Sequence, residues 1–403
     1  MIQGASTKRL FESLGPAGFV RKTRELLGLS RDRFGRPVVQ DPQLSPDEFS
    51  LRDLAESLVG SEWTSRLAPG SDGANLMEMD TAVAPSAFTN ISAWSATVGG
   101  LLEAKVLEEY RRPEYIADRL VRVLPTRQRS EKLVGISAVG DLAEEMAPGA
   151  PHPRAQFGER YVTTPETKKF GLAIDVTREA VFFDLTRQVM TQAENVGRWL
   201  GLRKEKRVLD VVLGITNTYS YRGTTYGTYL TSGNWINSHS NPLADWTDLD
   251  AALQLFAAMT DQETGERVLV TPSALLVMPY KQLTAGYVLN ATEIETRTSS
   301  ASEIRRGRNP LAGQYQVLSS PIAYQRLTDA DGGNLAANVA RDYWFFGDFA
   351  RAFGYMENWA LSVERTRPDD YTMRDRNLLV SVFANEMGTP AVLEPRQVVR
   401  NVN

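Results

Sequence analysis

A helix-like run from Phe182 to Gly214 constrains this chain more than any other feature of its sequence. Its apolar residues recur three or four positions apart, which predicts a helix with one buried stripe. Basic residues at 203–207 interrupt the stripe, and it resumes on a rotated face. A helix of about 30 residues would span about 45 Å. Because its apolar face rotates part-way along, its two halves must pack against different partners. The first stripe comprises Phe182, Leu185, Val189, Ala193, Val196 and Leu200, and the second Val208, Val211, Val212 and Leu213.

Two glycines, Gly197 and Gly201, lie inside this run. Each costs about 1 kcal/mol relative to alanine in a helix interior. Such a cost is tolerable where another element packs closely against the helix backbone. The sequence therefore predicts a close approach at this part of the helix.

Composition indicates a folded, soluble chain of two or more lobes, with 403 residues, 42% hydrophobic and 23% charged. No apolar run approaches the ~18 residues that cross a bilayer. The N-terminus lacks the apolar core of a secretion signal, and there are no cysteines. We therefore expect synthesis in the cytoplasm, with no disulfides, thiolate metal sites or cysteine nucleophiles. The net charge of -4 gives no basis for general nucleic-acid binding, although local basic patches are compatible with it.

Motifs for catalysis are missing from the sequence. The two histidines, His152 and His239, fall in Pro/Ser/Asn-rich stretches that predict solvated loops. Phosphate-binding, dinucleotide-binding and nucleophile-elbow motifs are absent. The stretch "DADGGN" at Asp329 lacks the later ligands of a calcium loop and is interpreted as a hairpin turn. We expect no catalytic residue, no cofactor and no metal, and hence a protein that is not an enzyme.

The first part of the chain, residues 1–84, reads as an arm of short helices rather than a compact domain. Helical patterns occur at Thr7–Leu14, Phe19–Leu27 and Pro46–Val59, the last with Ser45 as its N-cap. We expect little in the first 60 residues to bury a core of its own. Residues 85–126 then contain a helix that stops before Pro113.

Residues 127–180 predict a ribbon of two strands joined by a Gly/Pro-rich tip at 147–156. In the second strand, apolar residues at 170, 172, 174 and 176 alternate with small or polar ones, the period of a half-buried strand. An isolated two-stranded ribbon is only marginally stable in water. The ribbon must therefore pack against another structural element.

The remainder of the chain has three parts. Residues 181–245 hold the long helix and Tyr/Thr-rich loops, and residues 246–340 a mixed lobe with an amphipathic helix and a buried strand. Residues 341–403 are strand-rich, broken by a polar loop near 366–376. A basic run in the mixed lobe is read as a loop that is either solvated or in contact with another subunit or nucleic acid; it contains Arg305, Arg306 and Arg308.

This order resembles the major capsid protein of tailed bacteriophages, which has the Hong-Kong-97-like fold. "FGERYVTTPETKKFGLAIDVTREAVFFD" is similar to the second E-loop strand of that family running into its spine helix. "RNPLAGQYQVLSSPI", "YWFFGDFARAFGYMENW" and "GTPAVLEPRQVV" are similar to its A-domain strand and the return to its P-domain. The resemblance covers roughly residues 85–400. It implies an α+β fold with an N-terminal arm (1–84), a helix leading into the P-domain (85–126), an E-loop (127–180), a P-domain spine helix (181–245), an A-domain (246–340) and return strands of the P-domain (341–403).

The function implied by this resemblance is that of a structural subunit of a virion. The chain would assemble into hexamers and pentamers of an icosahedral shell, with portal and scaffold or decoration proteins, and enclose double-stranded DNA without sequence-specific binding. No membrane is involved. The E-loop contacts to a neighbouring subunit would involve Glu145, Phe157, Tyr161, Lys168, Lys169 and Phe170, and the basic contacts Arg305, Arg306 and Arg308.

Some features vary among the relatives. In some, an N-terminal segment is removed by a protease; here we expect the arm to stay attached. In others, an E-loop lysine is crosslinked to a P-domain asparagine, for which Lys168 or Lys169 and Asn358 or Asn385 are the candidates. Two alternatives remain: an encapsulin-type nanocompartment shell, and a glycan-binding or carbohydrate-active protein suggested by the Tyr/Trp-rich loops at 219–246.

Overall fold

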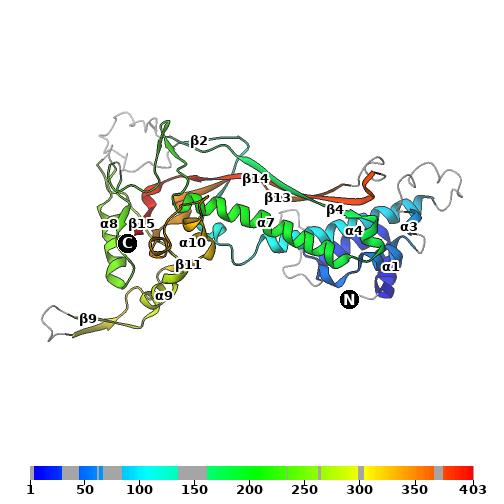
Figure 1. Ribbon diagram of the computed structural model, residues 1–403, viewed down its shortest axis with the longest axis horizontal. Helices are drawn as coiled ribbons and strands as arrows, with labels where there is room; N and C mark the ends of the chain where they lie inside the picture. The colour runs from blue at the N-terminus through cyan, green and yellow to red at the C-terminus, as the bar shows by residue number, and fades with distance from the viewer. Residues whose placement is uncertain are drawn as a thin grey trace, which may run out of the picture. The chain divides into compact units, whose positions relative to one another are not determined.

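The computed structural model describes residues 4–29, 45–60, 63–66, 84–134, 161–233, 235–261, 265–297, 304–366 and 375–402. Helices and strands are mixed along the chain (Figure 1), as the α+β prediction requires. The chain divides into two compact units, each with its own hydrophobic core. Unit 1 comprises residues 1–112, 169–202 and 361–386, and unit 2 comprises residues 113–168, 203–360 and 387–403.

Unit 1 is built mainly from helices that share one apolar core. Large side chains from three of them, Leu54, Trp94 and Val196, are almost fully buried there. Its elements are α1 (Gly4–Leu26), the 3-10 helix η1 (Pro46–Glu48), α2 (Leu51–Leu58), α3 (Trp63–Arg66), α4 (Ala84–Tyr110) and α6 (Arg178–Phe182), with most of β4 (Lys168–Thr177) and the first part of α7 (Thr186–Val212).

The N-terminal helices have no core of their own among the described residues and belong to this shared one. Leu51, Leu54 and Leu58 of α2 recur at helical spacing and are buried with residues of α4 and α7. Lys105 of α4 binds Asp47, with 2.9 Å between Nζ and Oδ2. Short helices form a core here because a partner further along the chain supplies the other half.

The helical pattern from Pro46 to Val59 is also split in the structure. Pro46 opens only η1, and Ser45 makes no side-chain cap. Instead Ser50 caps α2, because its hydroxyl accepts a hydrogen bond from the backbone N–H of Asp53. The two helices predicted around residue 15 are confirmed, since α1 is kinked at Gly15, whose φ of 67° is left-handed.

Helix α7 confirms the two-stripe prediction but begins later than expected. Asp184 adopts a left-handed φ of 50° and separates α6 from α7, so Phe182 and Leu185 are exposed rather than buried. The rest of the first stripe enters the core of unit 1. The second stripe, from Val208 to Leu213, enters the core of unit 2.

Gly197 lies where α7 crosses α4. A Cβ atom added there would overlap the carbonyl oxygen of Val106 and lie 3.0 Å from Cβ of Glu109. The predicted close approach is therefore present at Gly197, and Gly201 is buried as well.

Unit 2 is organised around a five-stranded sheet of order β11-β8-β12-β15-β7. Apolar strands β8 and β12 are buried along their whole length, which fits a sheet covered on both faces. One face packs with α8 and α9, and the other with α5, α10 and α12. The elements are α5 (Ala117–Leu120), β7 (Ser238–Ser240), α8 (Trp246–Ala258), β8 (Ala274–Val277), the 3-10 helix η2 (Pro279–Lys281), α9 (Gln282–Asn290), β11 (Gln316–Ser319), α10 (Pro321–Thr328), α11 (Ala337–Ala340), β12 (Trp344–Gly347), α12 (Phe349–Ala352), the 3-10 helix η3 (Pro395–Gln397) and β15 (Val398–Val402).

Two stretches of unit 2 predicted as loops lie in strands, and the turn predicted at Asp329 follows a helix instead of joining two strands. The basic run lies in strand β10 (Ile304–Arg308), which pairs antiparallel with β9 (Glu293–Arg297). The stretch at Asp329 follows helix α10 and folds back on it, as the N–H of Gly333 bonds the carbonyl of Arg326. His239 is exposed as predicted, but it lies in strand β7. Each turn or strand depends on a partner that local composition does not reveal.

Two long strands, β13 (Phe353–Thr366) and β14 (Leu378–Val392), contribute residues to both units. They belong to a four-stranded sheet of order β1-β13-β14-β4, with β1 at Arg122–Pro125. In unit 2, Arg207 fixes this sheet to α7, because its guanidinium donates to the carbonyl of Gly388 and the hydroxyl of Tyr355. The strand-rich return predicted for the C-terminal part is therefore confirmed.

The buried carboxylate of Glu205 holds the start of α5 in place. Glu205 of α7 accepts hydrogen bonds from the backbone N–H groups of Ile116 and Ala117, at 3.0 and 2.8 Å. Both N–H groups lie at the start of α5, where the helix itself offers them no acceptor. Burial raises the pKa of Glu205 above its ordinary value.

We predict that Leu54→Ala lowers the free energy of unfolding of the chain by about 2–5 kcal/mol, because it leaves a cavity in the core of unit 1. Glu56→Ala on the exposed face of α2 is the control and should leave stability nearly unchanged, since its ion pair with Arg52 is solvated. Chemical denaturation followed by circular dichroism measures both. Equal effects of the two variants would contradict the burial of α2.

Gly197→Ala should destabilise the chain by about 1–3 kcal/mol, because α7 must move away from α4 to accommodate the methyl group. Gly286→Ala in α9 is the matched control, since a Cβ there has no heavy atom within 4 Å. Helix propensity alone should make that variant more stable by about 1 kcal/mol. Opposite shifts of the thermal midpoint support the crossing, and a stabilising Gly197→Ala would refute it.

Glu205→Gln should flatten the pH dependence of stability. A raised folded-state pKa means that the folded chain holds the proton more tightly than the unfolded chain. The stability contributed by protonated Glu205 is therefore full below the unfolded pKa and is lost as pH rises through the folded pKa. Denaturation midpoints measured from pH 4 to pH 8 should show this fall in the parent chain and in Glu56→Gln, but less of it in Glu205→Gln.

Candidate functional site

The described residues contain no cluster of three or more His, Asp or Glu side chains placed to hold a metal ion. Within the same residues, no helix is both long and apolar enough to cross a membrane. Three surfaces of the described residues are candidate sites: the base of the predicted ribbon, the basic strand β10, and apolar side chains that stand in solvent.

The base of the ribbon is a small four-stranded sheet of order β2-β3-β5-β6 in unit 2. β2 (Lys132–Val134) pairs antiparallel with β3 (Tyr161–Thr163), as predicted for the two sides of a ribbon. β3 also pairs with β5 (Tyr219–Tyr221), which forms a hairpin with β6 (Thr224–Tyr226). The ribbon is therefore rooted in a sheet, although its tip at 147–156 lies outside the described residues.

Hydrogen bonds from the neighbouring loop hold this base in place. The N–H of Glu131 bonds the hydroxyl of Thr164, and the Ser130 hydroxyl bonds the Thr164 carbonyl at 2.6 Å. The N–H of Thr167 bonds the carbonyl of Arg129 at 2.8 Å. Both threonines are buried. These bonds hold the described strands at the base of the ribbon, β2 and β3, to the loop at 129–131.

Four of the six predicted E-loop contact residues are described, and they lie on two units. Tyr161 is half-buried with the Lys132 ammonium 4.8 Å from its ring centre, and Lys168 is exposed. In unit 1, Lys169 is exposed and Phe170 packs partly against the core. Glu145 and Phe157 lie outside the described residues, so their role stays a prediction.

The two asparagines proposed for the crosslink are both half-buried. The Asn358 amide donates hydrogen bonds to the carbonyls of Thr126 and Gln128, at 3.3 and 3.0 Å. Asn385 is half-buried in β14 opposite Gly171, where an added Cβ would lie 3.1 Å from Cβ of Asn385. Asn358 is therefore hydrogen-bonded to backbone carbonyls, and Asn385 packs against Gly171. The crosslink stays a prediction.

The basic residues lie on a two-stranded ribbon, β9–β10. Arg306 stands opposite Glu295 and Arg308 opposite Glu293, while Arg305 pairs with Thr296. Opposite charges on facing positions favour strand pairing. Sequence reasoning missed this ribbon, although the acidic residues of β9 were a signal that the run had a partner strand.

The aromatic loops at 219–246 are packing material. Trp235 is buried between Tyr219 and Tyr226, with ring centres 5.3 and 5.6 Å apart. A platform for sugar rings must leave an aromatic face open. The feature that suggested a glycan-binding protein is therefore used inside unit 2.

Among the exposed large apolar side chains, two groups lie close together in the sequence. In unit 1 they are Phe182, Phe183 and Leu185, at the corner between α6 and α7. In unit 2 they are Tyr280, Leu283 and Tyr287, on η2 and α9. Contiguous exposed apolar residues mark interaction surfaces. Sequence reasoning placed Phe182 and Leu185 in a buried stripe and did not single out the second group.

Comparison with known proteins adds one family and several solved structures. The family described as phage capsid protein matches residues 160–401, more than half of the chain. No curated protein matches the chain in sequence.

Three similar structures illustrate the matches. A phage-related protein of Bordetella bronchiseptica is 13% identical over 75% of this chain and 95% of its own, with a TM-score of 0.42. A structure of Mycobacterium phage Ogopogo is 14% identical over 71% of this chain and 91% of its own, with a TM-score of 0.38. A virus-like particle from Pyrococcus furiosus is 12% identical over 74% of this chain and 97% of its own, with a TM-score of 0.37.

Proposed function

The chain belongs to the phage capsid protein family, and we propose that it is the major capsid protein of a tailed phage or prophage. It assembles into hexamers and pentamers of an icosahedral shell that encloses double-stranded DNA. The observation that carries this proposal is the family match across residues 160–401, which includes the spine helix and both long return strands.

The physical basis of such a shell is repetition of the same interface. A subunit joined to its neighbour through two different surfaces forms closed rings, and each ring buries a large area. Chemistry is not required for this, so the proposal assigns the chain no enzymatic activity. Portal and scaffold or decoration proteins complete the particle, and no membrane takes part.

The parts of the chain receive roles in this proposal. Residues 127–180 are the E-loop, the helix within 181–245 is the spine, 246–340 is the A-domain, and 341–403 returns to the P-domain. The sheet β2-β3-β5-β6 supports an E-loop that reaches a neighbouring subunit, because it fixes the root of the ribbon. The E-loop contacts are Glu145, Phe157, Tyr161, Lys168, Lys169 and Phe170.

The charge of the chain suits a container for a polyanion. A net charge of -4 avoids binding DNA tightly along the whole inner wall. The arginines of β10, Arg305, Arg306 and Arg308, provide a local basic contact with a neighbouring subunit. The particle therefore holds its DNA by confinement, without sequence-specific binding.

The test of this proposal is assembly of the purified chain. Light scattering and negative-stain microscopy should detect shells, or discrete pentamers and hexamers, and nuclease-protected DNA should be found in particles from infected or induced cells. Particles that contain a cargo protein instead of DNA would identify an encapsulin-type compartment. A monomer at high concentration, unchanged by a scaffold protein or a crowding agent, would overturn the proposal.

Deletion of residues 147–156 should leave a folded subunit that assembles poorly, because the ribbon then cannot reach its neighbour. Circular dichroism and thermal midpoint should match the parent chain, while the yield of particles falls. Replacement of the same residues by a Gly/Ser segment of equal length is the control for loop length. Normal particles from the deletion would contradict the assignment of the E-loop.

A further inference from the structure

Helix α9 has an apolar face that unit 2 does not cover. Its inner face contributes Ala285, Val288 and Leu289 to the core. On the outer face, Leu283 and Tyr287 are 88% and 78% exposed. They are four positions apart and so lie side by side on the helix surface. The helix is therefore apolar on both faces, as expected for an element that packs between two partners.

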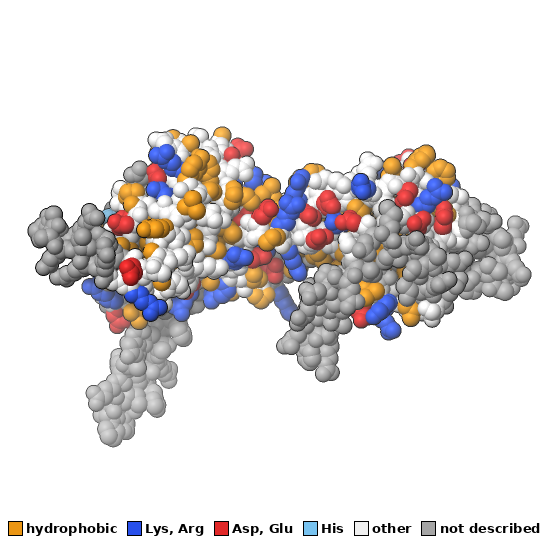
Figure 2. All heavy atoms as spheres, turned by 90° about the horizontal axis from the view of Figure 1, so that it is seen from below, with side chains coloured by type: hydrophobic (Ala, Val, Ile, Leu, Met, Phe, Trp, Pro, Cys, Tyr) orange, Lys and Arg blue, Asp and Glu red, His pale blue; other side chains and the backbone are white. Residues whose placement is uncertain are grey.

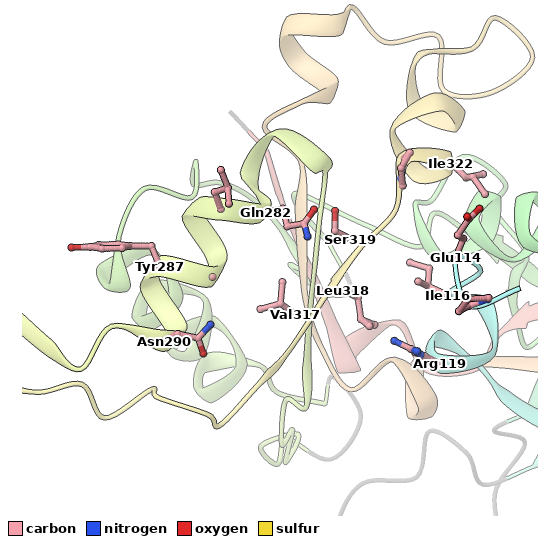
Figure 3. A pocket seen from close by; sticks show the side chains of 14 residues that line it. Glu114, Ile116, Arg119, Gln282, Tyr287, Asn290, Val317, Leu318, Ser319 and Ile322 are labelled. Carbon is pink, nitrogen blue, oxygen red and sulfur yellow. The ribbon is translucent and has the colours of Figure 1, made fainter.

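A hollow of about 930 Å³ lies beside this helix. In Figure 3, α9 forms one wall and the segment around α5 forms the other, with strand β11 between them. Val317, Leu318 and Ile322 supply apolar lining, and Glu114 and Arg119 stand on the α5 side. Tyr287 also lines the hollow, and its ring points away from the centre of the hollow. The surface thus combines a recess with an apolar ridge.

The ribbon β9–β10 is firmly joined to this helix. Asn309, at the end of β10, is buried, and its amide donates to the carbonyl of Val288 at 2.8 Å. Its N–H bonds the carbonyl of Thr292 at 3.0 Å. Helix, hollow and ribbon root therefore form one continuous surface, defined here as the α9 surface. A two-stranded ribbon alone is marginally stable and gains from a partner.

The size of the exposed patch indicates a protein partner. Tyr280, Leu283 and Tyr287 together expose roughly 400 Å², taking about 200 Å² for a large side chain. A stable interface buries about 800 Å² on each partner, which the hollow and the ribbon can complete. Small ligands instead prefer recesses that enclose most of their surface. Leu283 and Tyr287 project from the ridge, where such a ligand would leave them exposed.

We propose that the α9 surface receives a second copy of this chain. The inference rests on the proposed shell, because it names a surface through which one subunit meets the next. Seen from below in Figure 2, hydrophobic side chains gather on this side of unit 2 among charged ones, the mixture expected of an interface with a polar rim. The contact is heterologous: the α9 surface of one copy meets a different surface of its neighbour, which closes a ring.

Charge complementarity favours a copy of the same chain as the occupant. The described strands of the ribbon carry Arg297, Arg305, Arg306 and Arg308 against Glu293 and Glu295, an excess of positive charge. The chain as a whole is acidic, with exposed Asp245 and Asp250 at the start of α8. A basic ribbon beside an apolar ridge therefore fits the acidic surface of another subunit.

Thiol protection tests this contact directly, because the chain has no cysteine of its own. Leu283→Cys and Leu269→Cys each create one reactive thiol on an almost fully exposed position, 88% and 85% in the single chain. The rate of alkylation by a maleimide is measured for unassembled subunits and for particles. Leu283→Cys should react at least about tenfold more slowly in particles, whereas Leu269→Cys, outside the α9 surface, should change little.

The outcomes separate this inference from the proposed function. If the parent chain forms particles and Leu283→Cys reacts equally fast in subunits and particles, the α9 surface is not an interface, although the shell stands. If no particles form, the proposed function fails first. Equal protection of both thiols would show general burial in the particle and would overturn the specific assignment.

Leu283→Asp provides a second readout. It should leave the thermal midpoint of the subunit nearly unchanged, because the side chain is in solvent, and reduce the yield of particles at least about tenfold. Leu269→Asp is the matched control and should assemble normally. Particle yields that are equal for the two variants would overturn the proposal.

Discussion

The rest of the structure depends on helix α7 having two apolar stripes that face in different directions. Val189, Val196 and Leu200 complete the core of unit 1, and Val208 and Leu213 complete the core of unit 2. One continuous helix of 27 residues therefore contributes to two cores. At Gly197 the α4 backbone approaches so closely that a side chain has no room. Gly197 lowers the intrinsic stability of the helix. The close packing of α4 that it permits stabilises the helix in return.

Polar groups at the edges of the two cores fix the remaining elements. Glu205 pairs the first N–H groups of α5, and Arg207 holds Tyr355 and the Gly388 carbonyl. Threonines at the ribbon root bond the backbone of the preceding loop. A buried donor or acceptor without a partner costs more than a hydrogen bond gains, so these contacts determine geometry more than they add stability. They hold the start of α5, the long strands and the described root of the ribbon in place.

A subunit that carries a rooted ribbon, a basic strand pair and an uncovered apolar helix face is suited to association rather than catalysis. Membership of the phage capsid protein family indicates that the association builds a capsid. The family match says nothing about which surfaces meet. The α9 surface answers part of that question through exposure, shape and charge, and it lies in unit 2, as does the root of the ribbon.

The α+β class, the two stripes of α7, the close approach at Gly197, the strand at 168–177 and the strand-rich return could be predicted from the sequence. These follow from local periodicity, which records which side chains must be buried. Tertiary structure alone decided that Leu54 and its helix complete a core, that Phe182 and Leu185 are exposed, and that Arg305 lies in a strand. Each depends on something that local periodicity does not record: the packing of α4 against α2, a left-handed Asp184 before α7, and the pairing of β9 with β10. Periodicity shows that a face is apolar, but only the fold shows whether anything covers it, as Leu283 and Tyr287 demonstrate.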